Sequence, residues 1–152
     1  MCDVNALIRG LSRLAEVDVR LHDASMDLEL AADLPEVLAD EIQIQQVLIN
    51  LIHNGLEAMA GLDGAEKRLT VRSARSEADD VEVMVIDRGK GLPADADKIL
   101  FQPFFTTKES GMGVGLSLSR SIVTSHGGRL WFSRNPDRGA TFHLSLPAVI
   151  EG

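Results

Sequence analysis

The sequence predicts one domain of mixed α/β class, in which helices and strands alternate along the chain. Its 152 residues are 45% hydrophobic and 25% charged, a composition typical of globular domains and a length that suits one full core better than two. Three segments repeat apolar residues at helical spacing, and the segments between them alternate apolar and polar residues as strands do.

The first helix is predicted over residues 3–22, with Asp3 as its N-cap. Its apolar residues recur three and four positions apart: Val4, Leu7, Ile8, Leu11, Leu14, Val17 and Leu21. A short strand follows around Leu28 and Leu30, and residues 36–38 are a candidate for another.

The second helix has the clearest boundaries. Asp40 is a good N-cap, and Gln43 three residues later completes a capping box. The apolar pattern then continues to about Met59, and Gly61 and Gly64 end the helix.

The second half of the chain predicts two hairpins and a third helix. Strands at 68–75 and 80–87 are joined by a polar turn, and a helix over 114–126 ends at Gly127-Gly128. Strands at 129–133 and 141–146 form the second hairpin. Residues 93–110 lack periodicity, and such a long loop in a compact domain usually indicates a functional lid or a wrong assignment of elements.

Charge and cysteine content exclude several classes of protein. The formal net charge of −8 argues against binding nucleic acid or an anionic membrane surface. The single Cys2 allows no internal disulfide, which fits a reducing cytoplasm. Because no apolar run reaches about 18 residues, we expect a cytoplasmic domain without direct membrane contact.

Polar side chains share one face of the second helix, where Asn50 and Asn54 lie one turn apart. The full stripe is Gln43, Gln46, Asn50, Asn54 and Glu57. Amide oxygens suit a hard cation that already holds phosphates, so Asn50 and Asn54 are candidate Mg²⁺ ligands. A solvated polar face is the commoner explanation for such a helix alone, and the glycine turns downstream favour the site.

Asp87 follows an apolar strand and precedes Gly89 and Gly91. An ionised carboxylate only accepts hydrogen bonds, so it can receive the adenine amino group and would repel the guanine carbonyl oxygen. The glycines allow the backbone to pass close to a flat base. By itself the pattern is equally compatible with an ordinary hairpin turn.

Gly111, Gly113 and Gly115 lead into the third helix and form a candidate phosphate cradle. The segment is not a Walker loop, because no Gly-Lys-Ser/Thr follows, and a flexible linker is the alternative. Lys108, after Thr106 and Thr107, is either a ligand of the terminal phosphate or an exposed loop lysine.

His53 lies at the edge of the polar stripe, where it would contact either the γ-phosphate region or solvent. The other three histidines, His22, His126 and His143, lack a partner at metal-binding spacing. We therefore expect them to be structural or exposed.

Four segments in unbroken order resemble the ATP-binding catalytic domain of sensor histidine kinases, within the GHKL superfamily that includes gyrase, Hsp90 and MutL. They are similar to the N box at 46–58, the G1 box at 87–91, the F box at 101–108 and the G2 box at 111–116. The resemblance spans about residues 26–147 and is strongest to the nitrogen- and oxygen-regulatory branch, through the stretches 103–108 and 56–59.

The resemblance implies a two-layer α/β sandwich, the Bergerat fold, with helices on one face of a mixed, mostly antiparallel sheet. Residues 26–152 would be the catalytic domain, and residues 1–25 a helix leading from an upstream dimerisation domain that carries the phosphoacceptor histidine. Gly55 stands where alanine is usual, which should slightly weaken the second helix.

The resemblance also implies roles for single residues. Asn54 would coordinate Mg²⁺, Asn50 would support the metal or the phosphates, Asp87 would recognise adenine, and Lys108 with Asn54 would act in catalysis. The implied nucleotide contacts are Asn50, Asn54, Glu57, Asp87, Gly89, Gly91, Thr106, Thr107, Lys108, Gly111, Gly113, Val114, Gly115, Leu116 and Thr141.

The implied function is transfer of the ATP γ-phosphate to a histidine on a separate dimerisation domain, in a two-component phosphorelay with a response-regulator receiver domain as partner. His22-Asp23 is the one acceptor-like dipeptide, and it lacks the surrounding residues of an acceptor motif. A non-catalytic ATP-binding module is the alternative. A serine kinase or ATPase of the anti-sigma type is disfavoured by the F box.

Overall fold

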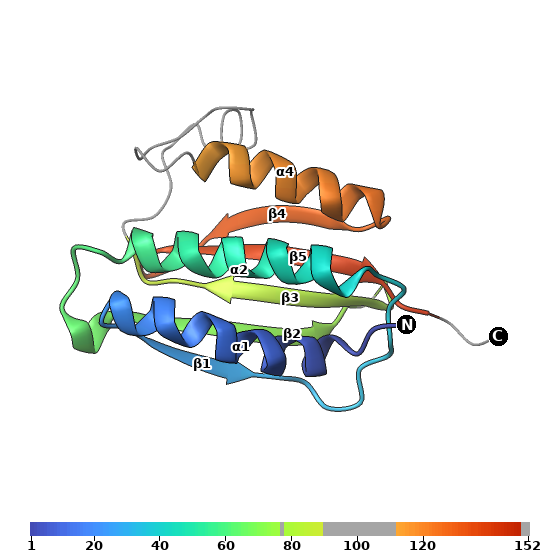
Figure 1. Cartoon of the computed structure of the whole chain (residues 1–152), viewed down its shortest axis with the longest axis horizontal. Helices are drawn as coiled ribbons and strands as arrows, with labels where there is room; N and C mark the ends of the chain where they lie inside the picture. The colour runs from blue at the N-terminus through green and yellow to red at the C-terminus, as the bar shows by residue number, and fades with distance from the viewer. Residues whose placement is uncertain (77, 90–111, 150–152) are drawn as a thin grey trace.

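The computed structural model describes residues 1–76, 78–89 and 112–149, which form two packed layers (Figure 1). The described elements are α1 (Val4–Leu21), β1 (Ser25–Glu29), α2 (Glu41–Ala58), the 3₁₀ turn η1 (Gly64–Glu66), β2 (Arg68–Arg75), β3 (Asp80–Ile86), α4 (Met112–Ser125), β4 (Arg129–Arg134) and β5 (Ala140–Pro147).

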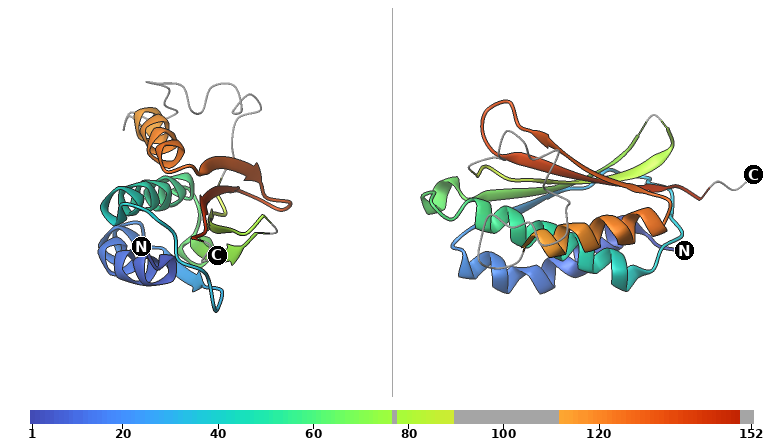
Figure 2. Two further views of the ribbon diagram at one scale, coloured as in Figure 1. Left: turned by 90° about the vertical axis from the view of Figure 1, so that its right-hand side faces the viewer. Right: turned by 90° about the horizontal axis from the view of Figure 1, so that it is seen from above.

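The described strands form one sheet in the order β1-β2-β3-β5-β4. Only β1 and β2 run parallel, and the other neighbours are antiparallel. The three helices α1, α2 and α4 all cover the same face of the sheet (Figure 2). The predicted two-layer sandwich with a mixed, mostly antiparallel sheet is therefore confirmed.

The core lies between the two layers because strand alternation turns one face of the sheet toward the helices. Val81, Val83 and Val85 of β3 are buried, whereas their neighbours along the strand are half-buried. Ile44, Leu48 and the rest of the apolar side of α2 pack against them, at 1% exposure or less for the largest side chains.

The helix boundaries follow the predicted caps. The Asp3 carboxylate accepts from the Ala6 amide at 3.1 Å, and Asp40 Oδ1 accepts from the amides of Ile42 at 3.0 Å and Gln43 at 3.3 Å. Gly127, at φ +75°, closes α4 in the left-handed conformation that glycine adopts most readily.

Residues 36–38 do not form a strand. Val37 instead makes isolated bridges to Cys2 on one side and to Ala148 on the other. The pairing is limited to a single bridge on each side. The segment nevertheless brings both of them to the fully buried Val37.

A buried polar contact joins α1 to the sheet. Ser73 Oγ donates to Asn5 Oδ1 at 2.7 Å and accepts from the Ala31 amide at 3.0 Å. Asn5 Nδ2 donates to the Ala31 carbonyl at 2.7 Å. The buried side of α1, which includes Ile8 and Leu11, belongs to the same apolar cluster as α2 and the sheet, so residues 4–21 share one core with the rest of the described chain.

Replacing Ser73 with alanine should destabilise the fold by about 2 kcal/mol, because it leaves a buried amide oxygen and a backbone N–H without their partner. Urea unfolding at constant pH measures the loss. Ser121→Ala is the matched control, since Ser121 is exposed and bonds only within α4. Equal midpoints for the two variants would contradict the structural role of Ser73.

Candidate functional site

The candidate site lies at one end of the sheet, where β3 leaves it beneath the C-terminal half of α2 (Figure 1). Helix and strand are very close there: a Cβ placed on Gly55 would lie 3.5 Å from Asp87 Cβ. The structure therefore brings together the two predicted groups of α2 and of the turn after β3, which are far apart in the sequence.

Asp87 is 4% exposed and is held by backbone groups. Its Oδ1 accepts from the amides of Gly89 at 2.8 Å and Ala140 at 3.2 Å, and its own amide donates to the Ala140 carbonyl at 3.0 Å. These contacts fix the direction of a buried carboxylate at the end of a strand. A fixed acceptor of this kind suits recognition of a hydrogen-bond donor on a ligand.

Gly89 is required by a close approach of two backbones. A Cβ at this position would lie 2.4 Å from the Ala58 carbonyl oxygen, a distance at which the backbone would have to move. The turn after β3 thus packs directly on the end of α2. This contact sets the separation between Asp87 and the polar residues of the helix.

Asn54 is 5% exposed, and within the described part of the chain neither atom of its side-chain amide has a hydrogen-bond partner. An unsatisfied buried polar group costs about 1 to 3 kcal/mol, so its presence needs an explanation. A ligand that binds the amide would supply one. Asn50, one turn earlier, is half-buried and donates from Nδ2 to Ser119 Oγ of α4 at 3.3 Å.

The polar stripe of α2 changes its surroundings along the helix. Gln43 and Gln46 are exposed, Asn50 is half-buried, and Asn54 is buried. The stripe is therefore a solvated face at its beginning and a buried surface at its end, so solvation explains only its first part.

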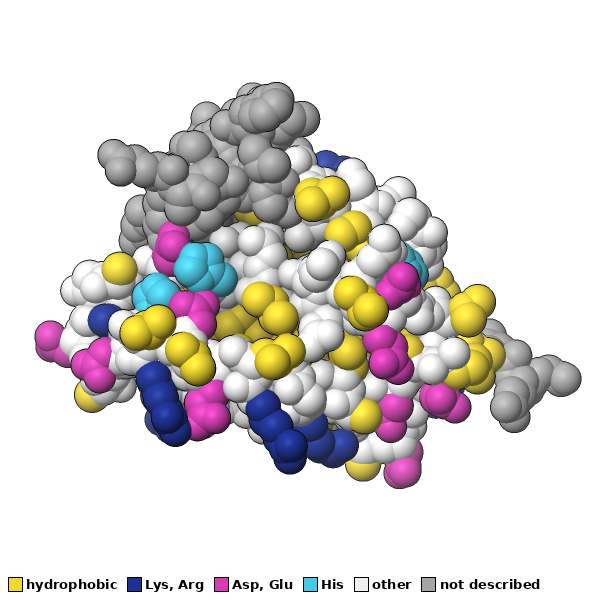
Figure 3. Space-filling model, viewed as in Figure 1, with side chains coloured by type: hydrophobic (Ala, Val, Ile, Leu, Met, Phe, Trp, Pro, Cys, Tyr) yellow, Lys and Arg dark blue, Asp and Glu magenta, His cyan; other side chains and the backbone are white. Residues whose placement is uncertain are grey.

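His53 contacts carboxylates rather than solvent alone. Its Nδ1 lies 2.8 Å from Asp18 Oδ2 of α1, and its Nε2 lies 2.7 Å from Glu57 Oε1 of α2. His22 approaches it edge-on, with ring centroids 5.8 Å apart. Figure 3 shows two imidazoles flanked by acidic side chains on this face.

The surroundings of His53 shift its protonation. Burial alone would lower the pKa of His53, but the hydrogen bond and charge of Asp18, followed by those of Glu57, raise this pKa above its ordinary value. Only the protonated ring can donate to both carboxylates. Glu57 is thus engaged by His53 in the structure as described.

Several predicted nucleotide contacts fall on residues that the structure does not describe: Gly91, Thr106, Thr107, Lys108 and Gly111. Gly113, Val114 and Gly115 lie in the first turn of α4, which begins at Met112 rather than at 114 as predicted. Leu116 is buried at 3% exposure.

Thr141 does not face Asp87. It pairs with Ile86 in the ladder, so strand alternation places its side chain on the sheet face away from the helices. Its hydroxyl donates to Asn135 Oδ1 at 2.6 Å. The structure therefore brings the backbone of this segment to Asp87 and turns the Thr141 side chain toward the β4–β5 hairpin.

Sequence reasoning missed Asn135 and Arg138, which contact the turn after β3. Asn135 Nδ2 donates to the Asp87 carbonyl at 2.8 Å, and Arg138 Nε donates to the Gly89 carbonyl at 3.2 Å. In the sequence they read only as hairpin-turn residues between Ser133 and Thr141. No local pattern could have shown contacts that span nearly 50 residues.

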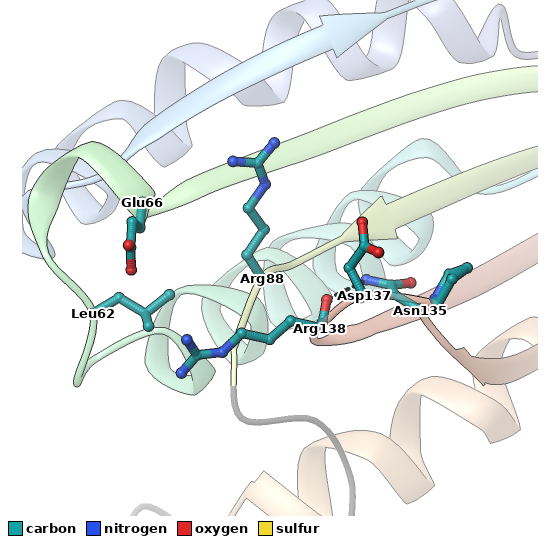
Figure 4. Close-up of a pocket in the computed structure, with 7 residues that line it drawn as sticks. Leu62, Glu66, Arg88, Asn135, Asp137 and Arg138 are labelled. Atoms are coloured by element: carbon teal, nitrogen blue, oxygen red, sulfur yellow. Dashed lines mark hydrogen bonds between the residues drawn. The ribbon is translucent and has the colours of Figure 1, made fainter.

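A hollow of about 510 Å³ lies on the outer side of this turn (Figure 4). Its walls are Leu62, Glu66, Arg88, Asn135, Pro136, Asp137 and Arg138. Among the described residues, none of the predicted adenine, metal or phosphate contacts lines it.

The described helices were also compared with the length and hydropathy that a membrane span requires. None of them is long and apolar enough to span a bilayer.

Residues 39–150 match the family model described as histidine kinase-, DNA gyrase B-, and HSP90-like ATPase. The chain belongs to this family. Sensor protein FixL of Bradyrhizobium diazoefficiens is 49% identical over 142 residues, and sensor protein TdiS of Thauera aromatica is 38% identical over 146. These alignments cover 93% and 95% of the chain, and 27% of each relative.

Solved structures give the same assignment. The catalytic domain of histidine kinase ThkA superposes with a TM-score of 0.82 at 31% identity, and the match covers 97% of this chain and 93% of that one. The chain is thus a member of this ATPase family that is similar to the catalytic domains of sensor histidine kinases, which confirms the predicted family. It spans about a quarter of the length of the bacterial sensor proteins named above.

The contact of His53 with the two carboxylates should stabilise the fold more in acid than in base. Because the folded-state pKa is raised, the contribution is complete below the unfolded value of about 6.5 and disappears as the pH rises through the folded value. His53→Gln should therefore lower the urea midpoint more at pH 6 than at pH 9.

The double variant with Asp18→Asn tests the cause of this pH dependence. If Asp18 is the main stabilising partner, the effect of His53→Gln should become nearly independent of pH in that background. If the effect of His53→Gln keeps its pH dependence in the Asp18→Asn background, that dependence comes from other groups around His53.

Proposed function

We propose that this domain binds ATP with Mg²⁺ and transfers the γ-phosphate to a histidine on a separate dimerisation domain. One observation carries most weight: the buried amide of Asn54 has no hydrogen-bond partner among the described residues, and the next residue of α2, Gly55, lies beside the buried Asp87. A polar ligand that spans these two groups explains why both are kept out of water.

Adenine would be recognised by Asp87. The carboxylate can accept the exocyclic amino group of adenine, and it would repel the carbonyl oxygen that guanine presents at the same position. Its fixed orientation, from Oδ1 contacts to the amides of Gly89 and Ala140, means that little ordering is required when the base binds. This favours ATP over GTP.

The donor set near the phosphates fits magnesium. In the described residues no group of three or more His, Cys, Asp and Glu side chains could hold a metal ion, whereas Asn54, with Asn50 one turn away, offers neutral oxygen ligands. When bound, Mg²⁺ would supply charge neutralisation to the phosphates. Asn54 would hold it, and Asn50 would support it or the phosphates.

The phosphates would lie toward the first turn of α4. Backbone N–H groups and the helix dipole make such a terminus favourable for anions, and Gly113 and Gly115 allow close approach. Lys108, Thr106 and Thr107 would add donors from the F box, as the resemblance implies. Phosphoryl transfer needs chiefly such positioning and charge neutralisation.

The partners follow from the same proposal. The acceptor histidine would lie on an upstream dimerisation domain, and the phosphoryl group would pass on to a receiver domain. The similar kinase ThkA has been seen in complex with the response regulator protein TrrA. We place the domain in the cytoplasm, where ATP is available.

Asn54→Leu should separate ligand binding from folding. An apolar residue of similar size removes a buried, unsatisfied amide, so the nucleotide-free protein should be at least as stable as the wild type. Calorimetric affinity for ATP in the presence of Mg²⁺ should fall by more than tenfold, and ATP binding in EDTA should change little. Unchanged Mg²⁺-dependent affinity would remove Asn54 from the site.

Labelling with γ-labelled ATP tests the transfer step. The chain alone should remain unlabelled, and a separately produced histidine-containing dimerisation domain of the sensor-kinase class should acquire acid-labile phosphate in trans. His22→Gln is the control. Phosphate on His22 would make His22-Asp23 an acceptor motif, and ATP binding without any transfer would favour a non-catalytic module.

A further inference from the structure

We propose that Asn135 and Arg138 of the β4–β5 hairpin are positioning residues for adenine selectivity, which hold the turn Asp87–Gly89 in the orientation that the base requires. The proposal rests on the recognition of adenine by Asp87 proposed above. It assigns a role in nucleotide choice to side chains that lie on the outer side of the turn.

The hairpin contacts Asp87 on three of its polar atoms. The Ala140 carbonyl accepts from the Asp87 amide at 3.0 Å, the Ala140 amide donates to Oδ1 at 3.2 Å, and Asn135 Nδ2 donates to the Asp87 carbonyl at 2.8 Å. The first contact continues the β3–β5 ladder, and in the second the Asp87 carboxylate accepts the hydrogen bond. The third contact is donated by the side-chain amide of Asn135, so it requires a side chain with an N–H donor at this position.

Asn135 is itself fixed by both ends of its amide. Its Oδ1 accepts from Thr141 Oγ1 at 2.6 Å, and its Nδ2 also lies 3.2 Å from the Arg138 carbonyl. Thr141 is 6% exposed, so the hydroxyl that orients the amide is sheltered from water. A chain of two hydrogen bonds therefore connects the Thr141 hydroxyl, through the Asn135 amide, to the Asp87 carbonyl.

A second hairpin side chain and helix α2 also hold the turn. Arg138 Nε donates to the Gly89 carbonyl at 3.2 Å, while the Cα of Gly89 packs so closely on α2 that a Cβ would lie 2.4 Å from the Ala58 carbonyl. Gly139, at φ +90°, lets the hairpin reach Asp87, because a Cβ there would lie 2.3 Å from the Asp87 carbonyl oxygen. The turn thus lies between helix and hairpin.

These supports matter because the turn contains glycine and would otherwise have a wide choice of backbone angles. A carboxylate distinguishes an amino group from a hydrogen or a carbonyl only while it is held in hydrogen-bond geometry, so loosened support should reduce discrimination first. Contacts to the phosphates, which lie elsewhere in the site, should be little affected.

Asn135→Asp is the most specific variant. It keeps the size of the side chain and the oxygen that accepts from Thr141, and it replaces the donor to the Asp87 carbonyl by a second acceptor. Thr141→Val removes the hydroxyl that orients Asn135 and serves as a second, independent variant. Asp137→Asn is the matched control, since Asp137 is an exposed residue of the same loop.

The experiment compares calorimetric affinities for ATP and for purine riboside triphosphate, which has hydrogen in place of the 6-amino group. The wild type should prefer ATP. Asn135→Asp and Thr141→Val should reduce this preference by about tenfold and leave the affinity for the purine analogue nearly unchanged. Asp87→Asn should lose most of the preference, and Asp137→Asn should retain it.

The possible outcomes separate this proposal from the function on which it rests. A wild type without preference for the 6-amino group would overturn adenine recognition by Asp87, and the role of the hairpin with it. A wild type that prefers ATP, with Asn135→Asp and Thr141→Val that retain the full preference, would overturn only the hairpin's role. Equal losses for both nucleotides would show a general structural effect and would also overturn it.

Discussion

The close approach of Gly89 to the end of α2 determines where the site can form. With no side chain at this position, the turn after β3 packs on the Ala58 carbonyl, and the last turns of the helix come to lie beside Asp87. Neither element makes a site alone: α2 supplies amides and β3 supplies a carboxylate. The two groups come together because the backbone of the turn meets the backbone of α2 at Gly89. The distance there leaves no room for the side chain of any other residue.

The same closeness imposes an energetic cost. Among the described residues the buried Asn54 amide has no hydrogen-bond partner, and a buried amide that lacks a partner costs about 1 to 3 kcal/mol. The large apolar core between the layers offsets this loss. Under the proposed function, a bound ligand would satisfy this amide, so binding and folding would be linked through one side chain.

Local signals predicted the elements of this fold well, and long-range contacts could not be predicted from them. Asp3 and Asp40 act as caps because capping depends on residues within one helical turn. By contrast, the polar stripe did not show that His53 would meet Asp18 of α1, and the hairpin turn did not show that Asn135 would meet Asp87. Such contacts depend on how elements pack, and that information is spread over the whole chain.

Gly55 shows how packing can reverse a conclusion drawn from propensity. In an isolated helix glycine costs about 1 kcal/mol relative to alanine, so the sequence alone indicates a weakness in α2. In the fold, an alanine Cβ would lie 2.6 Å from Leu69 Cδ1 and 3.5 Å from Asp87 Cβ. The tip of Leu69 would have to move within a fully buried position. The absence of a side chain at Gly55 thus lets α2 pack closely against Leu69 and Asp87, so a residue that weakens the isolated helix favours its packing on the sheet.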